Sequence, residues 1–177
     1  MSIIDSFDSK VLFFLQENLR NDILTKILLF FTRLGDYGIL WFIVIAILLL
    51  KNRREIAIKS LSSLAISFLL GGIIMKPSIE RLRPFQTLGD LNALIQPDGF
   101  SFPSGHTSTS FAMAFILYKN LPKKYGILFL IIAFIIAFSR IYLGAHFPTD
   151  IMGGIVLGAI SAILTEKIYK IYINKVK

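Results

Sequence analysis

The chain has 177 residues, enough for one domain; its apolar fraction is 55%, and only 17% of its residues are charged. Together with a mean hydropathy of +0.70, these values exclude an ordinary soluble protein and indicate a polytopic membrane protein. The lack of cysteine excludes disulfides and thiol chemistry. In a membrane protein, a net charge of +8 is interpreted first by the side of the membrane on which the basic residues lie, and not as a sign of a nucleic-acid partner.

Residues 1–34 combine apolar segments with charges. Apolar residues recur there at helical spacing and predict an amphipathic helix on the membrane surface. They are Phe7, Val11, Phe14 and Leu15, with Asp8, Glu17 and Arg20 elsewhere on the helix. The same acidic residues argue against a cleavable signal peptide. Ile23–Leu34 carries Lys26 and Arg33 and is either a short first span or part of the surface layer.

Five charge-free stretches follow and predict five transmembrane helices. They are Tyr37–Leu50, Ser60–Met75, a stretch from about Pro103 to Tyr118, Tyr125–Ser139 and Ile151–Thr165. A membrane helix needs about 20 residues, so each stretch must borrow a turn from its flanks. We therefore expect one all-α domain over residues 1–177, a membrane helix bundle with five or six transmembrane helices.

Basic residues gather at alternate connections between these spans. They are Lys51, Arg53, Arg54, Lys59, Lys119, Lys123, Lys124, Lys167, Lys170, Lys175 and Lys177. With five alternating spans all of them fall on one side, which the positive-inside rule makes cytoplasmic. Residues 76–103 and 140–150 are then extracytoplasmic, and we expect a protein of the bacterial plasma membrane.

Three short segments on the outer side carry four basic residues, both histidines and Asp150. They are Lys76–Pro84 (KPSIERLRP), Pro103–His106 (PSGH) and Ser139–Asp150 (SRIYLGAHFPTD). Polar groups at membrane depth are usually functional, and three fixed cations indicate a multiply charged anion such as phosphate. The three cations are Lys76, Arg83 and Arg140; Arg81 is interpreted as a surface charge.

The PSGH segment predicts a helix start that binds an anion. Pro103 can open the helix and leave the amides of Ser104, Gly105 and His106 unpaired. The Ser104 hydroxyl adds a donor, and Gly105 allows close approach of the backbone. With the three cations these residues predict a cage that stabilises charge during phosphoryl transfer. The hydroxyls of Thr107–Ser110 are expected only to pack helices.

Two histidines are available for chemistry, His106 and His146. One must attack phosphorus and the other must protonate the leaving oxygen. Asp150 follows His146 by four residues and could orient its ring, so His146 is the predicted nucleophile. Because His106 has no carboxylate nearby in the sequence, it suits the proton donor.

This residue set resembles the type 2 phosphatidic acid phosphatase family of integral membrane lipid phosphatases, whose core is shared with vanadium haloperoxidases. The family pattern K-x6-RP, PSGH, SR-x5-H-x3-D is filled at every position between Lys76 and Asp150. The resemblance implies a phosphohistidine intermediate on His146, His106 as the acid and a metal-free mechanism without a cofactor. It also implies that Lys76, Arg83, Ser104, Gly105, His106 and Arg140 hold the phosphate.

The expected activity is hydrolysis of a lipid phosphate ester or diphosphate, such as undecaprenyl diphosphate, phosphatidylglycerophosphate or phosphatidate. The branch devoted to undecaprenyl diphosphate often has an acidic residue where Gly105 stands, which weakens that narrower assignment. The alternative function is a phospholipid transporter or scramblase, which would need the cations but not His146 with Asp150.

Other sites are less consistent with the sequence. A metal site on His106, His146 and Asp150 would lack a zinc spacing such as H-E-x-x-H and would face three cations. A serine hydrolase would need a G-x-S-x-G elbow, which is missing from the sequence. Gly153, Gly154 and Gly158 are interpreted as sites of close helix packing.

Overall fold

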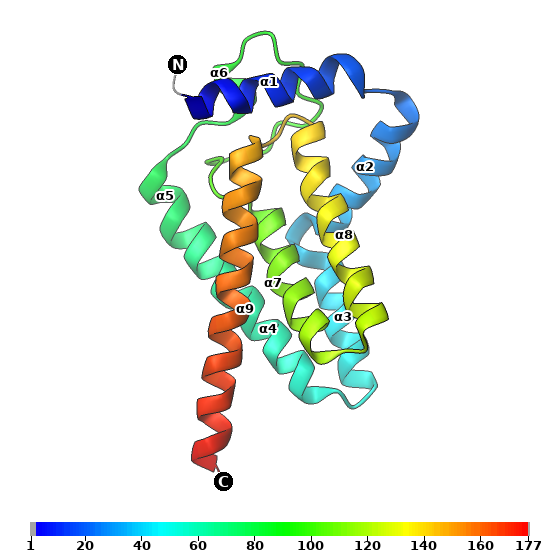
Figure 1. Ribbon diagram of the computed structural model, residues 1–177, viewed down its shortest axis with the longest axis vertical. Helices are drawn as coiled ribbons and strands as arrows, with labels where there is room; N and C mark the ends of the chain where they lie inside the picture. Colours follow the sequence, from blue (N-terminus) through cyan, green and yellow to red (C-terminus); the bar gives the residue numbers. More distant parts are fainter. Residues whose placement is uncertain (1–2, 177) are drawn as a thin grey trace.

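The computed structural model describes residues 3–176, and all regular secondary structure in this range is helical (Figure 1). Lys177, which was counted with the basic tail, lies outside the described residues. The elements are α1 (Ile3–Asn18), α2 (Asp22–Gly35), the 3-10 turn η1 (Asp36–Gly38), α3 (Ile39–Leu50), α4 (Arg54–Phe68), the π-helical segment η2 (Leu69–Met75), α5 (Lys76–Ile79), α6 (Pro84–Thr87), α7 (Gly105–Asn120), α8 (Lys123–Tyr142) and α9 (Pro148–Val176).

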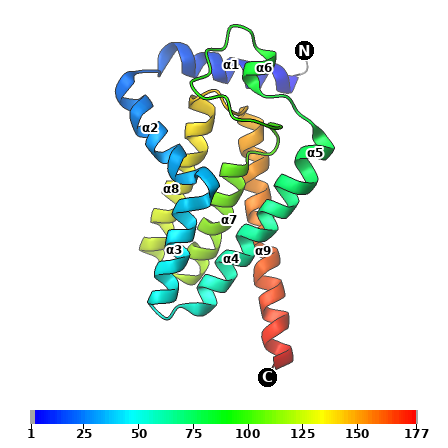
Figure 2. The ribbon, with the colours of Figure 1, turned by 180° about the vertical axis from the view of Figure 1, so that it is seen from behind.

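Five helices, α3, α4, α7, α8 and α9, form the bundle, and α1 lies across one of its ends (Figures 1 and 2). From that end α2 descends along α8 and continues through η1 into α3. Tyr37 and Gly38 adopt left-handed φ angles of 53° and 71°, which bend the path between the two helices. Residues 23–34 therefore form the first part of one bent helical path, Asp22–Leu50, which as a whole is long and apolar enough to cross a membrane.

The central helix of the bundle is α7, which packs against α4, α8 and α9. Its residues Met113, Ile116 and Leu117 are fully buried. Small residues of α9 allow its close approach: a Cβ on Gly158 would lie 2.7 Å from Phe111 Cβ and 2.8 Å from the Ala112 nitrogen. The predicted packing role of the α9 glycines is confirmed.

The outside of the bundle is apolar, as a lipid environment requires. Large exposed side chains include Ile43, Phe68, Phe134, Val156 and Ile163. Four stretches are long and apolar enough to cross a membrane, namely Asp22–Leu50, Arg54–Thr87, Lys123–Tyr142 and Pro148–Lys175. The predicted all-α membrane bundle is confirmed, and α7, with 16 residues, is shielded at its centre.

The basic connections and the three motif segments lie at opposite ends of the bundle. The α3–α4 and α7–α8 turns and the C-terminal part of α9 are at the end away from α1 (Figure 1). The α8–α9 turn lies beneath α1, and the segment between α5 and α7 passes beside and beyond α1 at the same end (Figures 1 and 2). The charge distribution along the sequence thus corresponds to two physical ends of the molecule.

The orientation of α1 corrects one expectation. Asp8 was placed on the polar face of a surface helix, but its side chain is fully buried against the bundle together with Leu12 and Leu15. Phe7 and Phe14 are instead exposed. A buried carboxylate needs partners, and Asp8 has an ion pair with Arg81 at 2.6 Å.

Candidate active site

His146 lies in the turn that joins α8 to α9 and is almost completely buried. The turn is held by the carbonyl oxygen of Arg140, which accepts hydrogen bonds from the amides of Ala145 (3.0 Å) and His146 (3.2 Å). The ring Nδ1 is 3.4 Å from Asp150 Oδ2 and 3.3 Å from Ser101 Oγ, and Nε2 is 3.2 Å from an Arg83 nitrogen. A proton on Nδ1 would satisfy Asp150 and leave the Nε2 lone pair for attack.

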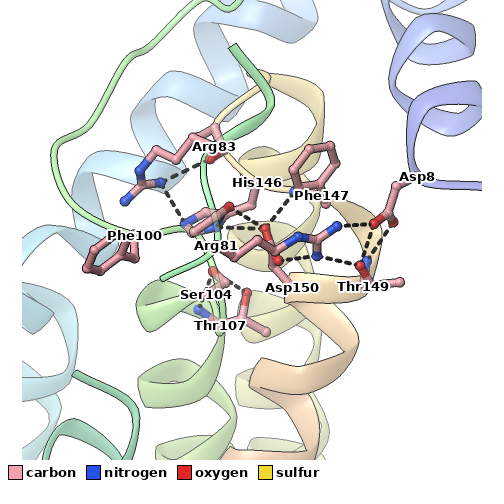
Figure 3. A network of polar contacts seen from close by, with 12 residues as sticks. Asp8, Arg81, Arg83, Phe100, Ser104, Thr107, His146, Phe147, Thr149 and Asp150 are labelled. Carbon is pink, nitrogen blue, oxygen red and sulfur yellow. Dashed lines mark hydrogen bonds and ion pairs between the residues drawn. The ribbon is translucent and has the colours of Figure 1, made fainter. Parts of the chain in front are cut away.

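Asp150, in the first turn of α9, is the carboxylate predicted to orient His146. Pro148 begins this helix, as the sequence indicated. Besides the contact to His146, Asp150 Oδ2 accepts hydrogen bonds from the Phe147 amide at 2.8 Å and from Ser101 Oγ at 2.5 Å. Its other oxygen pairs with Arg81 at 2.6 Å. Both carboxylate oxygens are thereby fixed (Figure 3).

The environment of His146 favours its neutral form. Burial lowers the pKa of His146 to about 3, with the charges of Arg140 and Arg83 acting in the same direction and the hydrogen bond to Asp150 opposing them. The ring is therefore uncharged near neutral pH and keeps Nε2 unprotonated, as a nucleophile needs.

Arg83 and Lys76 are cations bound by backbone carbonyls. Arg83 is buried and donates to the carbonyl oxygens of Gly99 (2.8 Å), Asp98 (2.9 Å) and Ala145 (3.0 Å). Lys76 follows the π-helical segment η2 and donates to the carbonyl oxygen of Phe100. Carbonyl partners fix both side chains without cancelling their charge, which keeps them available for an anion.

Arg140 is a buried cation with one donor nitrogen that faces no acceptor among the described residues. Its side chain is buried, and one of its terminal nitrogens donates to Thr32 Oγ1 at 2.5 Å. Its Nε is buried without a hydrogen-bond partner among the described residues. Because buried donors are almost always paired, an unpaired guanidinium nitrogen indicates a missing acceptor.

The start of α7 supplies the neutral donors. Ser104 is its N-cap and accepts from the Thr107 amide at 3.4 Å and from Thr107 Oγ1 at 3.0 Å. The Ser104 amide, expected to be free, instead donates to the Asp150 carbonyl oxygen at 3.1 Å and joins α7 to α9. The amides of Gly105 and His106 in the first turn remain for an anion. A Cβ on Gly105 would meet open space, so there is room for one.

His106 has a carboxylate partner that its sequence neighbours did not reveal. Its Nε2 is 2.9 Å from Asp36 Oδ1, which belongs to the η1 bend 70 residues earlier. The approach is close: a Cβ on Gly35 would lie 2.7 Å from the imidazole Cδ2. The α2–α3 bend therefore positions the predicted proton donor.

The sequence interpretation of Arg81 was wrong. Arg81 is not a free surface charge, because it pairs with both Asp8 and Asp150 at 2.6 Å and lies over the Phe147 ring. Ser101 was also missed, although it stands two residues before the PSGH segment. No group of three potential metal ligands is found within residues 3–176.

An apolar groove leads to the site from the side of the bundle. A cavity of about 670 Å³ lies between α3, α4 and α7. Its walls include Phe42, Leu61, Leu64, Ala65, Phe68 and Gly72. It ends on Lys76, Gly105 and His106, so apolar walls lead to a cationic end.

Comparison with known proteins gives consistent matches. A family model described as PAP2 superfamily matches residues 56–172. An undecaprenyl-diphosphatase of Sulfolobus acidocaldarius is 34% identical over 76% of this chain and 67% of that protein. Phosphatidylglycerophosphatase B of Bacillus subtilis is 37% identical over 52% of this chain and 48% of that protein. A Bacillus licheniformis protein named bacitracin transport permease protein BcrC is 37% identical, over 64% and 55% respectively. The matched region spans about half to two thirds of these relatives.

Two solved structures share the fold. LpxE of Aquifex aeolicus superposes with a TM-score of 0.81 and 28% identity, covering 94% of this chain and 99% of that one. A transmembrane PAP2-type phosphatidylglycerolphosphate phosphatase of Bacillus subtilis gives a TM-score of 0.78 and 28% identity, covering 100% and 89%. The likeness extends over nearly the whole chain, including α1 and the bend between α2 and α3.

Proposed function

This chain belongs to the PAP2 superfamily, and we propose that it is an integral membrane lipid phosphatase acting on a phosphate monoester or diphosphate. The family assignment confirms the resemblance found in the three motifs. The observation that carries the lipid substrate is the groove of about 670 Å³, which joins an apolar wall to Lys76, Gly105 and His106. A lipid chain suits the groove, and a phosphate suits its cationic end.

In the proposed mechanism, the phosphoryl group binds between the three cations and the start of α7. Lys76, Arg83 and Arg140 balance its charge, and the α7 amides with the Ser104 hydroxyl donate to its oxygens. His146 Nε2 forms a bond to the terminal phosphorus while the bond from that phosphorus to the leaving oxygen breaks, the ester oxygen of a monoester or the bridging oxygen of a diphosphate. His106 gives its proton to that oxygen.

Hydrolysis of the phosphohistidine completes the cycle. Neutral His106 takes a proton from water, whose oxygen attacks phosphorus as the bond to His146 Nε2 breaks. Inorganic phosphate leaves, and His106 regains its proton. Asp150 holds the Nδ1 proton of His146 in both steps and stabilises the cationic phosphorylated ring.

We further propose that the site faces the extracytoplasmic side of a bacterial plasma membrane. The basic connections lie at the opposite end of the bundle (Figure 1) and would be cytoplasmic by the positive-inside rule. Undecaprenyl diphosphate, phosphatidylglycerophosphate and phosphatidate are the candidate substrates, and the names of two relatives support the first two.

The test is phosphate release by the purified protein in detergent with excess chelator, using these three lipids. We expect release from at least one lipid and loss of release in His146→Gln, which lacks the nucleophile. A protein that releases phosphate from none of them but moves phospholipid across liposomes would be a transporter, and the proposal would fail. A reporter fused after α9 that proves external would reverse the sidedness.

A further inference from the structure

A second charged unit lies directly behind the catalytic pair and involves α1. Asp8 on α1 and Asp150 on α9 bind the same guanidinium, that of Arg81, through different terminal nitrogens at 2.6 Å each (Figure 3). Thr149, next to Asp150, donates its amide (3.0 Å) and its hydroxyl (2.5 Å) to Asp8. The proposed mechanism gives Asp8 and Arg81 no part, yet Arg81 touches Asp150, which holds His146, and Asp8 touches Arg81.

Asp8 is not needed to attach α1 by apolar contact. Leu12 of α1 is buried in a cluster with Leu91 and Phe147, which supplies a hydrophobic attachment. Placing a carboxylate beside that cluster costs desolvation, which partners only offset. Asp8 is fully buried and receives three donors from Arg81 and Thr149. Such a group indicates a role beyond anchoring the helix.

The arrangement shares one positive charge between two carboxylates. Arg81 approaches Asp150 Oδ1, while Asp150 Oδ2 faces His146 and Ser101. If Asp8 lost its charge, Asp150 would be the only carboxylate left on Arg81. Asp150 would then be more fully neutralised and would stabilise a cationic His146 ring less well.

We propose that Asp8 is a positioning residue for the phosphatase reaction, acting through Arg81 on the Asp150–His146 pair. The inference rests on the proposed function and adds α1 to the machinery. Asp8 touches no reacting atom: it fixes Arg81, Arg81 fixes Asp150 Oδ1, and Asp150 holds the Nδ1 proton of His146. The step affected is phosphorylation of His146, in which the ring gains positive charge.

The test compares Asp8→Asn with wild-type protein on the lipid phosphate that the wild type hydrolyses fastest. Asparagine keeps the shape of the side chain and removes its charge. We expect kcat to fall about tenfold or more, as for other residues that orient catalytic ligands, and KM to change less than twofold. Inhibition by inorganic phosphate should be unchanged, because the cage is untouched. Glu17→Gln, an equal charge change at an exposed position of α1, should keep wild-type activity.

A double-mutant cycle with Arg81→Gln separates positioning from stability. If Asp8 acts through Arg81, adding Asp8→Asn to Arg81→Gln causes no further loss of kcat. Activity of Asp8→Asn within twofold of wild type would overturn the inference. The inference would also be overturned if the two losses of kcat multiplied in the double variant and its melting temperature fell, because α1 would then matter only for stability. Wild-type protein without phosphatase activity would remove the proposed function itself.

Discussion

Ser104 offers a way to separate a structural from a catalytic role within one side chain. In both of its contacts the Ser104 oxygen is the acceptor, from the Thr107 amide and the Thr107 hydroxyl. The fold therefore uses its lone pairs and leaves its proton for a substrate oxygen. Its φ and ψ of −66° and 114° are open to alanine and glycine, so neither replacement strains the backbone.

The two replacements should differ in stability but not in activity. Alanine at an N-cap costs about 1 kcal/mol, whereas glycine costs only a few tenths. For a chain of this size 1 kcal/mol corresponds to a melting shift of about 2–4 °C. Both variants lose one hydrogen bond to a charged acceptor, worth about 1.5–3 kcal/mol. We therefore expect kcat/KM to fall about 10- to 150-fold in Ser104→Ala and Ser104→Gly alike.

The assay is phosphate release in detergent micelles, with thermal unfolding measured on the same preparations. Ser161→Ala is the control, because Ser161 is also buried but bonds a carbonyl oxygen within α9. If both Ser104 variants kept wild-type kcat/KM, the hydroxyl would not be a phosphate donor. If only the alanine variant lost activity, the loss would come from the helix cap.

Three further predictions concern pH, the groove and packing. The pKa of His146 is about 3 in the folded chain, whereas an ordinary histidine has a pKa of 6.5. Between these two pH values the unfolded chain binds a proton that the folded chain does not. The free energy of unfolding therefore falls as the pH is lowered. The His146→Gln variant should lose less stability than the wild type between pH 7 and pH 4. An equal drop in the melting temperature of both proteins would contradict the burial argument. Ala65→Trp should lower kcat/KM about tenfold for a long-chain lipid phosphate and little for a soluble phosphate ester, because Ala65 lines the groove. Ile58→Trp, at an exposed position on the same helix, is the control. An equal loss of kcat/KM on both substrates would argue against entry of the lipid through the groove. Gly158→Ala should lower the free energy of unfolding by about 1–3 kcal/mol, because the added methyl group overpacks α9 against α7. Gly89→Ala meets open space and should leave the stability nearly unchanged. Similar melting temperatures for the two variants would refute the packing argument.

Local spacing was enough to predict the centre of the site. His146 and Asp150 are four residues apart around Pro148, so their contact follows from a turn that leads into a helix. Asp36 and His106 are 70 residues apart, and Asp8 and Thr149 are 141 apart. Those contacts depend on how α1 and the α2–α3 bend fold back onto the bundle, which a single sequence does not encode as a local pattern.

The face of α1 was mispredicted for a reason specific to membranes. Apolar periodicity identified a stripe of Phe7, Val11, Phe14 and Leu15. Phe7 and Phe14 are exposed, and of the stripe only Leu15 is buried, together with Leu12. Lipid and protein interior are equally apolar, so hydrophobicity does not tell which face of such a helix meets the bundle. Asp8 carried the better signal, because a charge on the docked face requires a partner.

The contact of α1 with α9 has a consequence for biosynthesis. Asp8 is synthesised 141 residues before Thr149, its partner on α9. Until α9 emerges, α1 can pack on Leu91 and pair with Arg81 but lacks Thr149, and Asp150 is still missing. The charged unit behind His146 is therefore completed only when α9 is made, and chains interrupted before α9 would lack Asp150.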